Sequence, residues 1–98
     1  MIPKNLQGVL WSRDIAKLDL KKDKNYIIHN VLMYGTLPDI SWLKTVYSKE
    51  EISREFVNEP RKLYTNPAFN FIKTYVLGVK KELEQANYVK YLPRNIRQ

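Results

Sequence analysis

The feature that most constrains the fold is a series of apolar stretches with helical spacing, separated by residues that begin or end helices. Five prolines and three glycines lie where helix ends are expected. No run of alternating β-branched residues bounded by turns occurs, so we expect little or no sheet. The pattern predicts an all-α fold, a compact bundle of four to five short helices with a helix-turn-helix-like pair.

The first expected helix runs from about Leu20 to Tyr34. Asp19 is its expected N-cap, because a carboxylate can accept hydrogen bonds from the free N–H groups of the first turn. Gly35 is expected to end the helix in the left-handed conformation. The helix would bury a wide apolar face made of Tyr26, Ile27, Ile28, Val31, Leu32 and Tyr34.

The next two helices are expected to follow each other closely. Pro38 disfavours helix at the residue before it, so the second helix is expected over about 40–47 with Asp39 as its cap. Ser48 and Glu51 form a capping-box pattern, in which each side chain binds the backbone N–H of the other. The third helix would then point Ile52, Phe56 and Val57 inward and stop before Pro60.

The remaining segments are expected at the two ends of the chain. A fourth helix should begin at Asn66 with Pro67 in its first turn, and Gly78 should end or kink it. An amphipathic helix is plausible over 80–91, followed by a frayed basic tail at 92–98. Residues 1–19 are expected to be irregular or short helical, with several apolar side chains packed on the core: Leu6, Val9, Leu10, Trp11, Ile15 and Leu18.

Size and composition restrict the class of protein. Ninety-eight residues are expected to form a single domain over 1–98. The chain has no cysteine, so it has neither disulfides nor thiolate chemistry. It shows neither a secretory h-region in 1–20 nor an apolar run of the roughly 20 residues that a membrane span needs. We therefore expect a soluble cytoplasmic protein that makes no contact with membranes.

Positive charge is concentrated in the last third of the chain. The net charge is +7, and residues 60–98 hold eight basic residues against two acidic ones. Such a surface attracts polyanions or an acidic protein, although simple solubility is an equally good explanation. The candidate binding residues are basic side chains and the tyrosines between them: Arg61, Lys62, Tyr64, Lys73, Lys80, Lys81, Tyr88, Lys90, Arg94 and Arg97. The competing interpretation is that the tyrosines belong to the core and the charges are solvated.

The chain offers few parts for catalysis. His29 is the single histidine and is expected to have a structural role as a partly buried or surface side chain. Glu51 and Glu55 could form a carboxylate pair, but acids in a first helical turn are favoured by the helix dipole. There is neither a nucleophile elbow nor a glycine-rich phosphate loop. We expect a protein that is not an enzyme, with no cofactor and no metal.

The helix-turn-helix-like pair raises the possibility of sequence-specific DNA binding. A recognition helix must enter a groove lined by phosphates. The expected second helix of the pair, Lys49–Asn58, has three acidic residues against two basic ones, which opposes that use. Two adjacent amphipathic helices are also an ordinary way to build a small all-α domain.

Several short motifs resemble a small uncharacterised prokaryotic domain family. They are Leu10-Trp11-Ser12-Arg13-Asp14, Lys17-Leu18-Asp19, Ile27-Ile28, Val31-Leu32, Tyr34-Gly35, Tyr47-Ser48-Lys49-Glu50-Glu51-Ile52, Arg61-Lys62-Leu63 and Asn70-Phe71-Ile72. That family typically reads Phe-Trp-Asp, then Tyr-Gly-x-Glu-Glu-Ile, then Asn-Phe-Trp. The resemblance covers about 10–79, with Leu10, Ser48 and Ile72 as departures.

Members of that family are often encoded beside a nucleotidyltransferase-like toxin of the abortive-infection type. The resemblance therefore implies an antitoxin or accessory role, with that toxin as the protein partner. A DNA-binding regulator that uses the basic C-terminal third is the alternative, and an RNA-binding accessory would use the same surface. Oligomeric state stays open.

Overall fold

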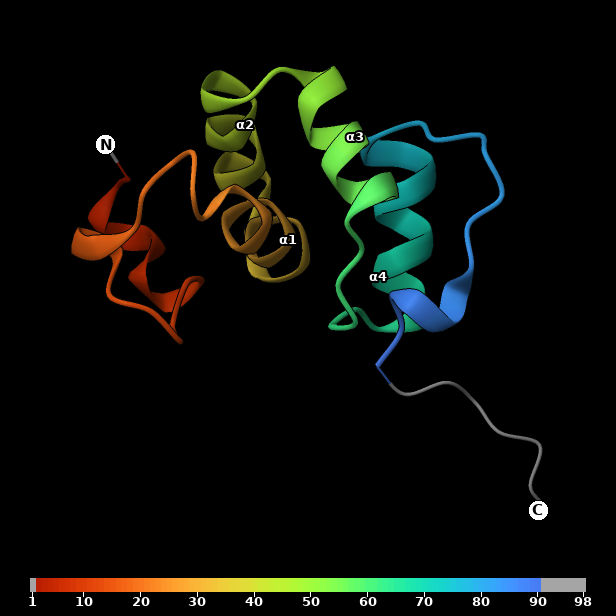
Figure 1. Ribbon diagram of the computed structural model, residues 1–98, viewed down its shortest axis with the longest axis horizontal. Coiled ribbons are helices and arrows are strands. Elements are labelled where there is room, and N and C mark those ends of the chain that lie inside the picture. Colours follow the sequence, from red (N-terminus) through yellow and green to blue (C-terminus); the bar gives the residue numbers. More distant parts are fainter. Residues whose placement is uncertain (1, 91–98) are drawn as a thin grey trace, which may run out of the picture.

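Short helices make up the regular structure of residues 2–90, the part of the chain that the computed structural model describes (Figure 1). The α-helices are α1 (Lys24–Tyr34), α2 (Leu37–Val46), α3 (Lys49–Asn58) and α4 (Asn66–Phe71), and α4 continues into a π-helical turn, η3 (Ile72–Val76). The described residues also form short 3-10 turns: η1 (Lys4–Gly8), η2 (Ile15–Lys17) and η4 (Gln85–Asn87). Residues 2–90 contain no strand, and one isolated β-bridge joins Tyr64 to Val89.

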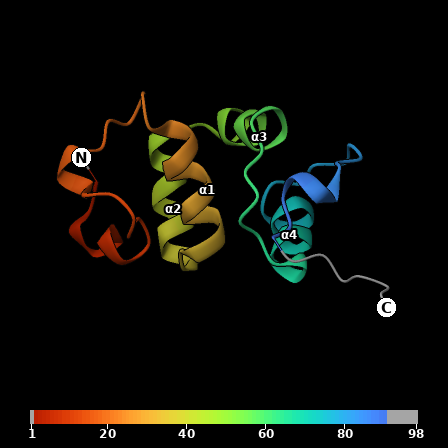
Figure 2. The same ribbon diagram turned by 60° about the horizontal axis from the view of Figure 1, so that its bottom comes forward.

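Helix α1 lies in the middle of the bundle. It packs against both α2 and α3, while the N-terminal segment lies on one side and α4 with the following chain lies on the other (Figures 1 and 2). Helices α2 and α3 are joined through Tyr47 and Ser48, so the expected helix-turn-helix-like pair is present. The all-α bundle predicted from the sequence is confirmed. None of the helices in residues 2–90 is long and apolar enough to cross a membrane.

Helix α1 begins four residues later than predicted. Asp19 caps the turn before the helix: one of its carboxylate oxygens accepts hydrogen bonds from the N–H groups of Lys21 at 2.7 Å and Lys22 at 2.9 Å. These backbone hydrogen bonds lower the pKa of the Asp19 carboxyl. Asp23 is the residue at the N-cap, and its carboxylate accepts a bond from the Asp19 N–H at 2.8 Å. The predicted cap therefore stabilises a turn that leads into the helix.

Gly35 ends α1 in a conformation that differs from the prediction. Its φ is −78°, in the extended region, so the expected left-handed cap is absent. Glycine is needed there for space, because a Cβ would lie 2.6 Å from the carbonyl oxygen of Val31. Within residues 2–90 the left-handed glycine is Gly78, with φ +63°, which ends η3 as predicted.

Helix α2 begins three residues earlier than predicted. The Thr36 hydroxyl accepts a hydrogen bond from the Asp39 N–H at 3.4 Å, and the Asp39 carboxylate accepts one from the Thr36 N–H at 2.9 Å. Thr36 is thus the cap and Asp39 the third residue of a capping box. Pro38 lies in the first turn, where a missing N–H is tolerated, so it did not exclude Leu37 from the helix.

The capping box predicted for α3 is half formed. The Ser48 hydroxyl accepts a hydrogen bond from the Glu51 N–H at 3.1 Å, as expected. The Glu51 carboxylate turns instead to the ammonium of Lys24 in α1, at 3.2 Å. Helix α3 buries Ile52 and Phe56 as predicted.

The chain after Gly78 differs most from the prediction. The amphipathic helix expected over 80–91 is replaced, as far as residue 90, by irregular chain and the short turn η4. The N–H of Tyr64 donates to the Tyr88 carbonyl and the N–H of Lys90 donates to the Tyr64 carbonyl, both at 2.9 Å. The backbone around Tyr88 and Lys90 therefore forms hydrogen bonds with Tyr64, before α4, instead of the hydrogen bonds of a helix. The expected tail at 92–98 lies outside the described residues.

The core is one cluster that reaches from the N-terminal segment to Val89. Leu6 and Leu10 are buried in it, and Val9, Ile15 and Leu18 pack against it, as expected. Trp11 does not: its side chain is 65% exposed, which corrects the prediction for this residue. On the far side, ring contacts join α1, α3, α4 and the returning chain in an aromatic cluster: His29, Phe56, Tyr64, Phe69 and Tyr88.

Candidate partner-binding surface

The two tyrosines proposed for the basic surface lie inside the protein. Tyr64 and Tyr88 are 0% and 1% exposed. The Tyr88 hydroxyl donates to the Phe56 carbonyl at 2.7 Å, and burial raises the pKa of both tyrosine hydroxyls above the ordinary value. Neither ring can contact a partner. The prediction that these two tyrosines bind a partner is wrong, because the spacing of Tyr64 and Tyr88 places both rings in the core.

Arg61 is held by the fold. Its Nε donates a hydrogen bond to the side-chain oxygen of Asn25 at 2.7 Å, and its guanidinium lies 5.6 Å from the ring centre of Tyr26. Arg13 lies 5.1 Å from the same ring centre and also pairs with Asp23 at 2.8 Å. The Tyr26 ring therefore has two guanidinium groups beside it, and such contacts stabilise a fold. Arg61 has a structural role that its place in a basic stretch did not reveal.

The remaining basic candidates do not form one patch. Lys62 precedes α4, Lys73 is half-buried within η3, and Lys80 and Lys81 follow Gly78. The helical stretch 66–76 lies between the first and the last of them. The exposed Lys90 is drawn back toward the N-terminal end of α4 by its backbone bond to Tyr64. Arg94 and Arg97 lie outside the described residues.

His29 is fully buried, beyond the partial burial expected, and joins three parts of the chain. Its Nε2 lies 2.8 Å from the Glu59 carbonyl oxygen, which can only accept, so Nε2 carries the proton. Nδ1 then accepts a hydrogen bond from the Tyr64 hydroxyl at 2.7 Å. Burial lowers the pKa of His29 from 6.5 to about 4. Both ring nitrogens are thus engaged in holding the end of α3 and the start of α4 on α1.

The glutamates of α3 are also paired across a helix contact. The Lys24 ammonium lies 3.2 Å from the Glu51 carboxylate and 3.9 Å from that of Glu55. Asn25 donates to Glu55 at 2.9 Å and to the Glu59 carbonyl at 2.8 Å. This arrangement supports the structural interpretation of the glutamate pair. Residues 2–90 contain no group of three side chains that could hold a metal ion.

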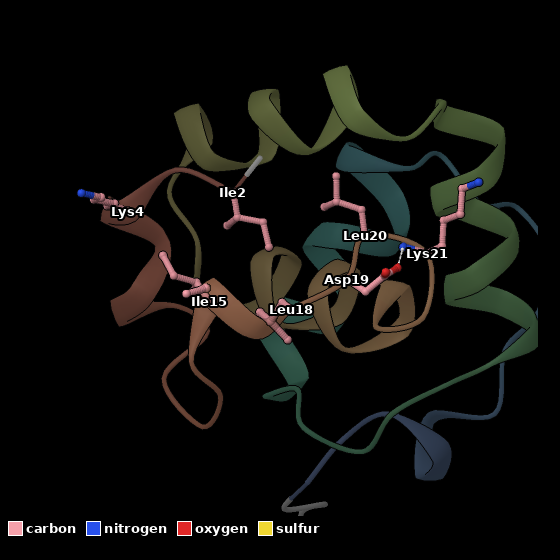
Figure 3. A pocket seen from close by; sticks show the side chains of 8 residues that line it. Ile2, Lys4, Ile15, Leu18, Asp19, Leu20 and Lys21 are labelled. Carbon is pink, nitrogen blue, oxygen red and sulfur yellow. Dashed lines mark hydrogen bonds between the residues drawn. The ribbon is translucent and has the colours of Figure 1, made fainter.

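A hollow of about 600 Å³ lies beside the N-terminal segment (Figure 3). Its walls are mainly apolar, with the ammonium groups of Lys4 and Lys21 at its outer ends. Asp19 is the acidic residue in the lining, and one of its carboxylate oxygens accepts the two backbone hydrogen bonds described above. The hollow therefore presents mainly apolar surface.

The strongest candidate surface is the outward face of α4–η3, which we name the aromatic face. Phe71 and Tyr75 are 47% and 78% exposed, and their ring centres lie 5.8 Å apart. The exposed positions of this face carry no charge: Pro67, Asn70, Phe71, Thr74 and Tyr75. The inward face of the same stretch buries Phe69 and Ile72. The π-helical turn lies within the aromatic face, and such turns are frequent at functional sites.

The sequence contained a signal for this face that the search for basic residues missed. Phe71 and Tyr75 are four residues apart, and they are out of phase with the buried Phe69, Ile72 and Val76. The chain has 28% charged residues, yet every exposed position of α4–η3 is uncharged. An exposed aromatic pair on a neutral face is typical of an interaction surface.

Comparison with protein families gives a match over the first part of the chain. A family model described as a family of unknown function (DUF6922) matches residues 6–56, just over half of the sequence. The match ends at Phe56 in α3, before the aromatic face begins. No curated protein and no solved structure matches the chain. The chain therefore belongs to this family of unknown function, DUF6922.

Proposed function

We propose that this chain is a non-catalytic, antitoxin-like module that binds a protein partner through the aromatic face of α4–η3. The exposure of Phe71 and Tyr75 on a helix face without charge carries the proposal. Aromatic residues are enriched at the centres of protein interfaces and supply much of the binding energy, whereas charged residues are depleted there. The burial and pairing of His29 support a non-catalytic role, because neither ring nitrogen is free to exchange protons with a substrate.

The partner we propose is a nucleotidyltransferase-like toxin of the abortive-infection type. This choice rests on the resemblance of the motifs between Leu10 and Val79 to a family often encoded beside such toxins. DNA binding by the basic C-terminal third has less support. Tyr64 and Tyr88 are buried, and Arg61 is bound to Asn25. The exposed lysines Lys62, Lys80 and Lys81 are divided between the two ends of α4–η3.

Co-expression with the product of the adjacent gene, followed by copurification, tests the proposal. We expect a complex with the unaltered chain and loss of that complex with Phe71→Ser/Tyr75→Ser. Leu37→Ser is the matched control, because Leu37 is 68% exposed on α2, away from the aromatic face. A complex that survives the double substitution, or that Leu37→Ser disrupts equally, would contradict the assignment of the surface. Absence of any complex with the adjacent gene product would contradict the partner.

A further inference from the structure

The segment that carries the aromatic face, 60–81, has charge of one sign. From Pro60 through Lys81 the chain has five basic residues and no acidic one. Arg61 is held by Asn25 and Tyr26, and Lys73 is half-buried. The lysines of this segment that are exposed are Lys62 at the N-terminal end of α4–η3 and Lys80 with Lys81 at its C-terminal end. The neutral face is therefore bounded by ammonium groups at both ends.

The position of Lys80 and Lys81 follows from how the helix ends. The N–H of Val79 donates to the Lys73 carbonyl at 2.8 Å, and Gly78 turns the chain with a positive φ. The next two residues after Val79, Lys80 and Lys81, therefore lie directly beyond the C-terminal end of η3. Both lysines are exposed, and the described residues supply neither with an ion pair.

On the basis of the proposed function, we infer that the partner presents an apolar patch flanked by carboxylates, so that apolar side chains contact Phe71 and Tyr75 while acidic groups approach Lys62, Lys80 and Lys81. The apolar contact supplies most of the affinity. The charges select an acidic partner and accelerate its approach. The net charge of +7 adds long-range attraction of the same sign.

A protein partner fits this surface better than single-stranded nucleic acid. Bases stack on aromatic rings in a groove whose cations follow the phosphate backbone. Here the two rings are in contact with each other, and the cation between them in the sequence, Lys73, is half-buried. After Lys81 the sign of the charge changes, with Glu82 and Glu84 both exposed. A continuous track for phosphates is absent from this face.

The test uses two designed 16-residue helical peptides with the same leucine stripe, one flanked by glutamates and the other by lysines. Binding to the full chain is measured by fluorescence anisotropy at physiological salt. We expect the glutamate peptide to bind at least 10-fold more tightly, and Phe71→Ser/Tyr75→Ser to abolish binding of both. Charge reversal by Lys62→Glu/Lys80→Glu/Lys81→Glu should remove or invert the preference.

The matched control is Lys17→Glu/Lys22→Glu/Lys44→Glu, which changes the net charge equally at exposed lysines elsewhere. This variant should keep a preference for the glutamate peptide. Three outcomes would overturn the inferred partner chemistry. The two peptides could bind equally, neither could bind, or both triple variants could lose the preference for the glutamate peptide to the same extent. Micromolar binding of a 20-nucleotide oligothymidylate that is lost with Phe71→Ser/Tyr75→Ser would overturn it in favour of nucleic acid.

These outcomes are separate from those of the copurification experiment. Suppose that the complex requires Phe71 and Tyr75 but is unaffected by charge reversal at Lys62, Lys80 and Lys81. That result would support the protein-binding function and contradict the inference that the partner is acidic.

Discussion

Helices α3 and α4–η3 meet through similar inner faces and present different outer faces. Inside, Phe56 of α3 and Phe69 of α4 stack with ring centres 6.2 Å apart in the aromatic cluster. Outside, α3 exposes the charged side chains Lys49, Glu50 and Arg54. The outer face of α4–η3 instead exposes an aromatic pair and no charge. Burial explains both inner faces and solvation explains the outer face of α3, so the outer face of α4–η3 requires another explanation, which we assign to a partner.

The first prediction concerns the inner faces. Phe56→Ala should lower the free energy of unfolding by about 3–5 kcal/mol, because it leaves a cavity among packed rings. Urea denaturation followed by circular dichroism measures this change. Phe56→Leu, which conserves most of the volume, should cost less than about 1.5 kcal/mol and keeps the test informative if the alanine variant is unfolded. Near-equal stability of all three proteins would show that the two helices do not share a core.

The second prediction concerns the joint between the two helices. The pKa of His29 is about 4 in the folded protein, below its ordinary value of 6.5. Between pH 4 and pH 6.5 the unfolded chain therefore binds more protons at His29 than the folded chain does. The stability that comes from burying neutral His29 is fully present above pH 6.5 and is lost as the pH falls toward 4. The loss should total about 3 kcal/mol, at about 1.4 kcal/mol per pH unit.

Urea titrations at a series of pH values measure this slope, and His29→Gln supplies the reference. His29 is the single histidine, so the variant should lack most of the change between pH 5 and 6.5. An equal slope in both proteins would mean that His29 is not the buried neutral base between Glu59 and Tyr64.

The third prediction separates two neighbouring cations on the chain that connects α3 to α4. Arg61→Ala should destabilise the fold by about 1 kcal/mol, through loss of the hydrogen bond to Asn25 and of the contact with Tyr26. Lys62→Ala should change stability by less than about 0.5 kcal/mol, since Lys62 is exposed. Thermal denaturation of the two variants compares them directly. If Lys62→Ala were the more damaging substitution, the assignment of Arg61 to the fold would be wrong.

The fourth and smallest effect is expected on the outer faces. Tyr75→Ser on the aromatic face and Arg54→Ser on α3 should each change the free energy of unfolding by less than about 0.5 kcal/mol. Tyr75 is 78% exposed, so little of its ring is buried in the free protein. A loss of more than 1 kcal/mol for Tyr75→Ser, about twice that limit, would indicate that the ring serves the fold and not a partner.

The fold class and most helices could be predicted from local patterns, whereas several caps could not. Ser48 and the Asn66–Pro67 start act within one turn of chain, so the sequence reveals them. The shift of α1 and α2 arose because two plausible caps compete at each start. Asp19 accepts hydrogen bonds in the turn before α1. Thr36 is the N-cap of α2 because its hydroxyl accepts a hydrogen bond from the Asp39 N–H, so Asp39 lies inside the first turn and is not the cap.

The candidate surface was harder to predict because it depends on contacts between distant residues. The contact of Arg61 with Tyr26 and the burial of Tyr64 against His29 join positions 35 residues apart. The replacement of the last expected helix by backbone pairing between Tyr64 and Tyr88 has the same origin. Tyr75, by contrast, lies on the face opposite the buried stripe of its own helix. Helical phase alone would have identified it.

The central claim is that the aromatic face contacts a protein partner and the outer face of α3 does not. The direct measurement places a photoreactive benzoylphenylalanine at position 75 or at position 54 and irradiates the complex with the adjacent gene product. We predict a covalent adduct from position 75 and none from position 54, with the adduct lost at position 75 when Phe71→Ser is added. Equal crosslinking from both positions, or crosslinking from position 54 alone, would contradict the claim.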